Sequence, residues 1–154
     1  MNLLDIFQNE IIIVSIFSWA VAQIIKTIIH AIMYKGIDWK RLVGDGGMPS
    51  AHSATVTSLA IYTGLTYGFK SAVFAVALIF AIIVMHDAMG VRREAGRHAK
   101  ALNELYENMD KENQDKENPT PDVMLKEFLG HSPLQVLMGA LLGLAIALTY
   151  YYVV

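Results

Sequence analysis

Long apolar stretches separated by short polar segments restrict this chain more than any other feature of its sequence. Residues 11–33 and 134–154 are each long enough to cross the hydrocarbon core of a bilayer, which takes roughly 20 residues of helix. Two further apolar runs, 49–67 and 72–85, lie between them. Hydrophobic residues make up 55% of the chain and charged residues only 17%, which favours a membrane protein over a soluble domain. We therefore expect an all-α, polytopic membrane bundle with about four transmembrane helices.

The rest of the sequence indicates one membrane domain, 1–154, with a polar insertion at about 90–130. Within that insertion, residues 91–105 are charged and predicted to be helical, and residues 123–129 are predicted to form a short amphipathic helix. The polar residues 106–122, with two prolines, predict a solvated loop. The absence of cysteine excludes disulfides and thiolate metal sites, and a net charge of -2 does not indicate a nucleic-acid partner. The N-terminus lacks a basic region, so a removable signal peptide is not expected.

The distribution of Lys and Arg predicts how the bundle is oriented. With four spans, the loops at 34–48 and 90–130 lie on one side of the membrane, and the other side holds only Lys70. Basic loops stay in the cytoplasm, so we expect both termini on the outer side of the cell membrane and the polar loops on the cytoplasmic side. The basic residues assigned to the cytoplasmic loops are Lys35, Lys40, Arg41, Arg92, Arg93, Arg97, Lys100, Lys111, Lys116 and Lys126.

The stretch from Gly46 to Ser53 gathers groups that can bind an anion at the start of the second apolar run. Pro49 suits the first turn of a helix, and a helix that begins there directs its free N–H groups and positive dipole end at a ligand such as phosphate. Ser50 adds a hydroxyl donor, and His52 can carry a proton near neutral pH. The alternative interpretation is an ordinary loop that turns into a helix.

Lys26 is an ionisable residue within the first apolar stretch. It shares one helix face with Gln23 and His30 because the three residues are spaced at i, i+3 and i+7. An ionisable residue in a span usually faces a polar interior, which makes Lys26 a candidate functional residue. The alternative is that its long stem carries the ammonium group to the interface.

Other polar residues near span ends fall on the same predicted side. Asp87, Arg92 and Arg93 follow the third span, and His131 precedes the fourth. Two helix starts that each carry a histidine, together with several cations, favour a phosphate site in which one imidazole attacks phosphorus and the other protonates the leaving alcohol. The alternative is that each of these residues is an ordinary interfacial residue at a separate helix end.

Gly139 and Gly143 form a G-x-x-x-G pattern in the fourth span, which predicts close approach of another helix. The partner helix belongs either to the same bundle or to a second copy of the chain in a homodimer.

Two segments of the chain resemble motifs of a known superfamily. Gly47-Met48-Pro49-Ser50-Ala51-His52 resembles the Pro-Ser-Gly-His signature of the type 2 phosphatidic acid phosphatase superfamily, with Ala51 where glycine is usual. His131-Ser132-Pro133-Leu134-Gln135 resembles its third motif, in which an acid follows the histidine by four residues. Together with the run from Asp87 to Gly96, these segments resemble a divergent branch of the superfamily made of small bacterial and plant membrane proteins.

The resemblance implies roles for three residues of these motifs. His131 corresponds to the histidine that forms a phosphoenzyme, His52 to the histidine that protonates the leaving group, and Ser50 to the serine that binds phosphate.

The chain also departs from the superfamily pattern. Gln135 stands where the acid that orients the nucleophile is usual, and Leu125 stands where the third-motif arginine is usual. The first motif is absent, so Lys26, or Arg92 and Arg93, would have to bind phosphate in its place. Asp87 would hold one of these arginines through a charge-assisted hydrogen bond.

Three functions follow from these observations. The first is a membrane phosphatase that hydrolyses a phospholipid or polyprenyl phosphate or pyrophosphate at the cytoplasmic surface, with no metal or other cofactor. The second is a non-catalytic protein that binds phosphate or a lipid head group on a degenerate phosphatase scaffold. The third and weakest is a metal-dependent site, whose candidate ligands fit no known spacing. These candidates are Asp45, His86, Asp87 and Glu127.

Overall fold

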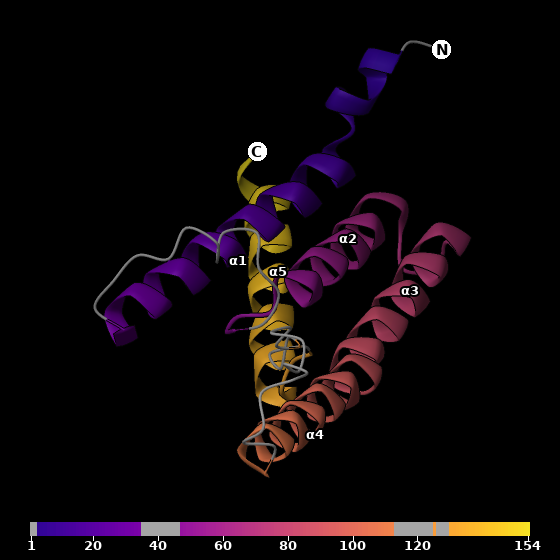
Figure 1. Ribbon diagram of the computed structural model, residues 1–154. Coiled ribbons are helices and arrows are strands. Elements are labelled where there is room, and N and C mark those ends of the chain that lie inside the picture. The colour runs from indigo at the N-terminus through magenta and orange to yellow at the C-terminus, as the bar shows by residue number, and fades with distance from the viewer. Residues whose placement is uncertain (1–2, 35–46, 113–124, 126–129) are drawn as a thin grey trace.

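The regular structure of the protein is helical throughout the residues described by the computed structural model, which are 3–34, 47–112, 125 and 130–154. This finding confirms the predicted all-α membrane bundle (Figure 1). In chain order, the elements are the 3₁₀ helix η1 (Leu3–Gln8) and the α-helices α1 (Glu10–Tyr34), α2 (Ala51–Tyr67), α3 (Ala72–Met89), α4 (Val91–Glu112) and α5 (Pro133–Val153).

Three of these helices, α1, α3 and α5, are long and apolar enough to cross a membrane. Helix α2 has 17 residues, at the lower end of the roughly 17–25 residues that a spanning helix needs. It packs against α1, α3 and α5, which makes it the central helix of the bundle (Figure 1). Several of its Ser and Thr hydroxyls donate to carbonyl oxygens of α2 itself, as Thr55 does to Ala51 at 2.8 Å and Ser58 to Thr55 at 2.9 Å, which allows them to be buried between helices.

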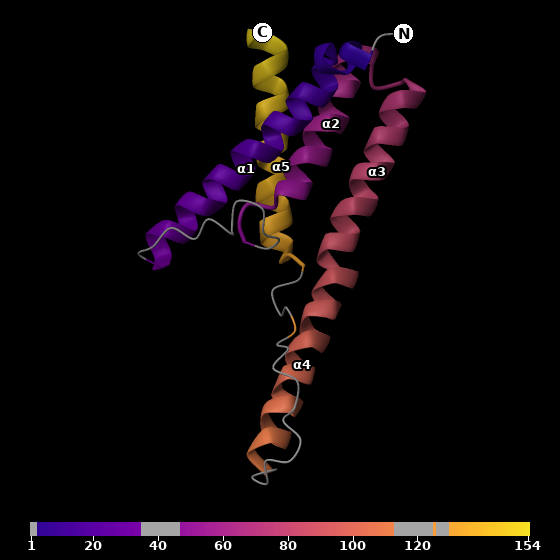
Figure 2. The same cartoon turned by 45° about the horizontal axis from the view of Figure 1, so that its top comes forward.

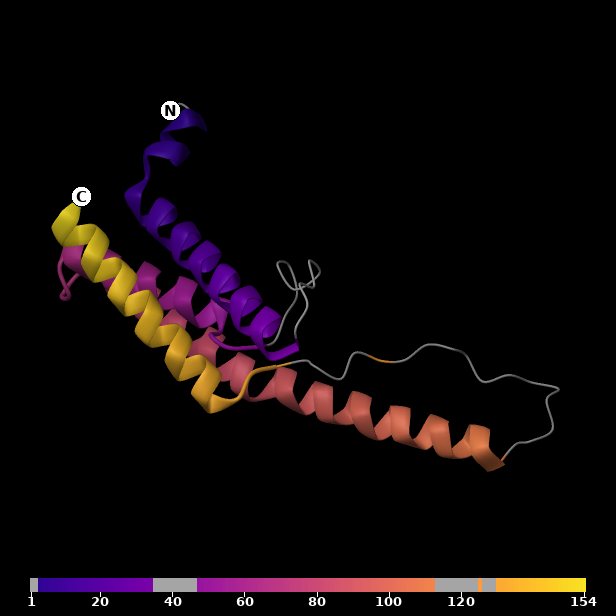
Figure 3. The same cartoon turned by 90° about the vertical axis from the view of Figure 1, so that its left-hand side faces the viewer.

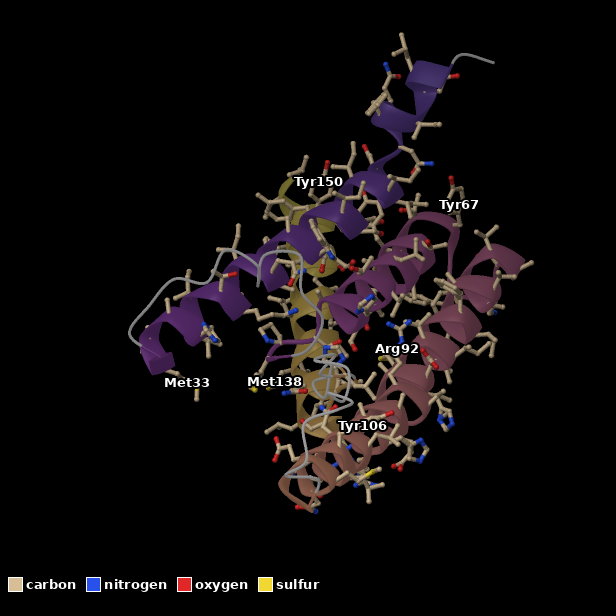
Figure 4. The ribbon with its side chains drawn as sticks, in the orientation of Figure 1. Met33, Tyr67, Arg92, Tyr106, Met138 and Tyr150 are labelled. Atoms are coloured by element: carbon tan, nitrogen blue, oxygen red, sulfur yellow. The ribbon has the colours of Figure 1, made fainter. Side chains whose placement is uncertain are left out.

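Helices α1, α2, α3 and α5 alternate in direction, so that both termini lie at one end of the bundle together with the turn between α2 and α3 (Figure 2). The start of α2, the end of α3 and the start of α5 lie at the other end, which we call the site end. In Figure 4, Tyr67 and Tyr150 lie toward the end with the termini, and Arg92 and Met138 lie toward the site end.

Helix α4 continues from α3 and extends beyond the bundle at the site end (Figure 3). Hydrogen bonding is maintained through the junction, because the Gly90 N–H donates to the His86 carbonyl at 2.9 Å and the Glu94 N–H donates to the Gly90 carbonyl at 3.0 Å.

One prediction within the polar insertion is wrong. Residues 106–112 belong to α4 and not to the predicted loop 106–122. Their composition is polar, but the prolines that favour a loop, Pro119 and Pro121, lie beyond the end of α4, so residues 106–112 contain no helix breaker. Residues 113–122 and, apart from Leu125, the predicted helix 123–129 lie outside the described residues.

Helices α2 and α5 pack closely at the two glycines of the G-x-x-x-G pattern. A Cβ atom on Gly139 would overlap the Ser50 carbonyl oxygen, and one on Gly143 would overlap the Ala54 carbonyl oxygen. The predicted close approach is therefore confirmed, and it is made within the bundle. Homodimerisation stays a prediction. At the opposite end of the bundle, α2 is linked to α1 by the Tyr62 hydroxyl, which donates to a Glu10 carboxylate oxygen at 2.6 Å.

Candidate functional site

The imidazole rings of His52 and His131 lie next to each other at the site end. Their centroids are 6.3 Å apart and their planes are inclined by 76°, an edge-to-face arrangement. His52 lies in the first turn of α2 and is half-buried, whereas His131 precedes α5 by two residues and is only 4% exposed. The structure thus brings together the two histidines that the sequence predicted for one site.

The backbone around His131 is held against the junction of α3 and α4. The His131 N–H donates to the Ala88 carbonyl oxygen at 2.9 Å. Gly130 has φ of +85°, and a Cβ atom there would overlap the backbone nitrogen of Arg93. Only glycine allows both this dihedral and this approach at low cost. The end of α3 and the first turn of α4 therefore determine where the backbone of His131 lies.

The start of α5 is closed by its own side chains. Ser132 is the N-cap residue, and its hydroxyl oxygen accepts the Gln135 N–H at 3.3 Å. The Gln135 side-chain oxygen accepts the Ser132 N–H at 2.9 Å, which completes a capping box. Pro133 has no N–H to offer. This helix start therefore presents few free donors to an anion.

Gln135, the residue predicted to orient the nucleophile, makes its hydrogen bond with the backbone and not with the imidazole of His131. Its side-chain oxygen fixes the N–H group of the residue that directly follows His131. With the bond from the His131 N–H to Ala88, the chain is held on both sides of the histidine. A direct effect of Gln135 on the imidazole stays a prediction.

The start of α2 is arranged differently. Ser50 is completely buried, and its hydroxyl oxygen accepts both the N–H of Ser53, at 3.3 Å, and the Ser53 hydroxyl, at 3.0 Å. Two accepted bonds occupy both lone pairs, so the Ser50 hydroxyl remains available only as a donor. In the described part of the chain, the N–H groups of Ala51 and His52 have no acceptor. The Ser50 N–H donates to the Gln135 carbonyl at 3.0 Å, which links the two helix starts.

The predicted basic residues lie on two sides of these helix starts. Arg92 pairs with Asp87 at 2.7 Å between Nε and Oδ2, which is the ion pair expected from the sequence. Arg93 is exposed and makes no ion pair with the residues that the structure describes, and its backbone contacts the segment that carries His131. Lys26, from α1, is 4% exposed and packs its aliphatic stem against Gly47 ahead of α2. A Cβ atom added to Gly47 would lie 3.1 Å from the Lys26 Cγ atom.

Two polar residues near the site did not stand out as site residues in the sequence. Ser53 is completely buried and supports the Ser50 hydroxyl. Gln23 is 6% exposed on α1 and shares a helix face with Lys26, which is the one signal that singles it out.

A metal centre receives no support from the side chains that can be placed. Among residues 3–34, 47–112, 125 and 130–154, no three His, Asp or Glu side chains are grouped so that they could hold a metal ion. Two candidate ligands of the metal-dependent alternative, Asp45 and Glu127, lie outside these residues.

Comparisons with known proteins place the chain among membrane proteins. The model of the Divergent PAP2 family matches residues 7–146. A protein of Bacillus subtilis (strain 168) described as "Uncharacterized membrane protein YuiD" is 38% identical over 155 residues, which cover 97% of this chain and 98% of that protein. No solved structure matches the chain significantly.

Proposed function

Because the chain belongs to the Divergent PAP2 family, we propose that it is an integral membrane phosphatase that hydrolyses a lipid phosphate or pyrophosphate through a phosphohistidine. The observation that carries this proposal is the pairing of His52 and His131 between the starts of α2 and α5. The basic residues of the polar loops favour a site that faces the cytoplasm.

The two rings are close enough for one phosphoryl group to reach both of them. A nucleophile attacks phosphorus from about 3–3.5 Å, and a general acid reaches the leaving oxygen at about 2.6–3.2 Å. The P–O bond lies between these two distances, so the reacting nitrogens must be farther apart than the 6.3 Å between the ring centroids. A phosphate that contacts both imidazoles therefore lies against the ring edges and not between the rings.

The reaction then has two steps. A ring nitrogen of neutral His131 attacks phosphorus, the bond from phosphorus to the leaving oxygen breaks, and protonated His52 gives its proton to that oxygen. A water molecule next attacks the phosphohistidine and passes a proton to His52, the P–N bond breaks, and inorganic phosphate leaves. Both histidines are then back in their starting protonation states.

Charge on the phosphoryl oxygens is balanced by donors at the start of α2 and by one arginine. The Ser50 hydroxyl and the N–H groups of Ala51 and His52 are the donors, and they lie at the positive end of the helix dipole. Arg93, whose backbone contacts Gly130, is the arginine that would supply a full positive charge, whereas the charge of Arg92 is partly offset by Asp87. Lys26 adds a further positive charge at the segment that leads into α2.

The experiment that tests this proposal measures phosphate release by the purified full chain in lipid nanodiscs. The substrates are phosphatidate, phosphatidylglycerophosphate, polyprenyl phosphate and polyprenyl pyrophosphate. We expect His131→Ala to reduce release to background and His52→Ala to reduce it by roughly 10²–10⁴-fold. His98→Ala, on the exposed surface of α4, is the matched control and should retain full activity. Unchanged rates in both site variants would refute the assignment.

A second candidate is a non-catalytic protein that binds phosphate or a lipid head group at the same place. One observation favours it: the Gln135 side chain carries no charge to stabilise an imidazolium, and its oxygen is already used in the capping box. This alternative predicts saturable binding of phosphate, weakened by Arg93→Ala, with no phosphate release from any of the four substrates.

A further inference from the structure

Gln23 places an unsatisfied acceptor inside the membrane-spanning helix α1. The residue is 6% exposed, and its side-chain oxygen Oε1 is buried and accepts no hydrogen bond within the described part of the chain. Leaving a buried acceptor without a donor destabilises the folded protein. Buried polar atoms without a partner are rare in folded proteins, and such an atom often marks a place where another molecule or ion binds.

The position of Gln23 relates this acceptor to the candidate site. Its neighbour Ala22 packs against Ala51 and Ala54, so Gln23 lies at the level of the first turn of α2. Lys26 lies on the same face of α1, one turn closer to the site end, and contacts Gly47. Gln23 and Lys26 therefore lie beside the segment that carries Ser50 and His52.

The chemistry of the Oε1 atom defines what it can bind. An amide oxygen only accepts hydrogen bonds, and the oxygens of a phosphate dianion also only accept them, so the two repel each other. A hydroxyl group, in contrast, can donate to the amide oxygen. A phosphate group alone therefore leaves the Gln23 oxygen without a donor, whereas a head group that also carries a hydroxyl can donate to it.

We propose that Gln23 is a specificity-determining residue that accepts a hydrogen bond from a hydroxyl group of the substrate. The substrate class is then a lipid whose terminal phosphate is carried by a polyol, such as a glycerol phosphate with a free hydroxyl. Lipids whose phosphate is attached directly to an isoprenoid chain, or to a glycerol with no free hydroxyl, lack this donor. This inference rests on the proposed function, since it assigns the substrate of the same site.

The test compares two soluble probes that differ only in hydroxyl groups, glycerol 3-phosphate and propyl phosphate. Their binding to the purified, detergent-solubilised full chain is measured by isothermal titration calorimetry. We expect the wild type to prefer glycerol 3-phosphate by roughly two- to ten-fold, the value of one hydrogen bond. Gln23→Met, which keeps the side-chain length and removes the acceptor, should abolish this preference and leave binding of propyl phosphate unchanged.

The controls separate recognition from a structural role. Ser15→Ala removes a different buried polar group from α1, a hydroxyl that donates to the Ile11 carbonyl of the same helix, and should keep the preference. Gln23→Leu repeats the test if the Met variant does not fold. A change in affinity by the same factor for both probes would show that Gln23 only supports the structure, and would overturn the inference.

The inference would also be overturned by equal binding of the two probes to the wild type, by no binding of either, or by a preference that persists in Gln23→Met. The binding readout does not require turnover. A protein that prefers glycerol 3-phosphate but releases no phosphate would refute the proposed phosphatase and leave the role of Gln23 supported. A phosphatase without the preference would refute only the role of Gln23.

Discussion

The starts of α2 and α5 are built from similar residues but differ in what they leave free. A glycine with φ of +85° precedes each helix, Gly47 in one case and Gly130 in the other, and a serine caps each. At α5 the capping box uses the local donors, and the neighbouring histidine is fixed against α3. At α2 the N–H groups of Ala51 and His52 find no acceptor in the described residues. The comparison suggests a division of roles, in which α2 receives the anion and α5 holds the nucleophile.

The largest effect on stability is expected where the start of α5 packs against the start of α2. Gly139→Val would place side-chain atoms into the Ser50 carbonyl and force α2 and α5 apart. We expect a loss of roughly 1–3 kcal/mol or more in the free energy of unfolding, together with loss of activity. Thermal unfolding in detergent measures the effect. Ala145→Val, at an exposed position of α5, is the control, and an equal change in both variants would contradict the packing described.

The second prediction compares substitutions of Gly130 and Gly47, the glycines that precede the two helix starts. Both Gly130→Ala and Gly47→Ala place a side chain at positive φ, which costs roughly 1–2 kcal/mol. At Gly130 the new Cβ also overlaps the backbone of Arg93, whereas at Gly47 it meets the flexible stem of Lys26. We therefore expect Gly130→Ala to lower the unfolding temperature and the rate of phosphate release more than Gly47→Ala. The reverse order would show that His131 does not depend on the α3–α4 junction.

The third prediction separates the two caps. Ser50→Ala and Ser132→Ala each remove an N-cap and should each cost roughly 1 kcal/mol of stability. Only Ser50 is proposed to donate to phosphate, so its loss should also reduce kcat/KM by roughly ten-fold or more. Steady-state kinetics beside thermal unfolding distinguishes these effects. Equal kcat/KM for the two variants would mean that the α2 cap does not contact the substrate.

The smallest effect is expected at Gln135. Gln135→Glu keeps the acceptor of the capping box and adds a negative charge near the start of α5, a change worth roughly 0.3–1 kcal/mol of added stability. The added charge should also stabilise the positive charge that develops on the His131 ring as it bonds to phosphorus, and so raise kcat modestly. Gln135→Leu removes the acceptor and should lower both quantities. A Glu variant less stable than the Leu variant would show that the capping box is unimportant.

Sequence reasoning predicts the helices and the histidine pair because both follow from chain topology. Apolar runs long enough to span a bilayer locate α1, α3 and α5, and alternating spans bring His52 and His131 to one end. The same reasoning makes α4 too short, because a charged helix and a solvated loop have similar compositions, and composition alone does not show that the helix continues through residues 106–112.

The details of the site depend on side-chain partners that sequence spacing does not reveal. The Gln135 oxygen could bond to the imidazole or to the backbone, and only the geometry shows that it caps the helix. The contact of Lys26 with Gly47 and the unsatisfied oxygen of Gln23 depend likewise on how α1 packs against the start of α2. Such contacts join residues far apart in the chain, so periodicity along one helix cannot predict them.

The central claim is that one phosphoryl group contacts both His52 and His131, with His131 as its acceptor. The most direct test incubates the His52→Ala variant with 4-nitrophenyl phosphate, whose leaving group needs no proton donor, and locates any added phosphoryl group by mass spectrometry. Because His52 also activates the water of the second step, we predict that an acid-labile phosphohistidine accumulates at residue 131. A phosphoryl group on another residue, or none on His131, would contradict the account.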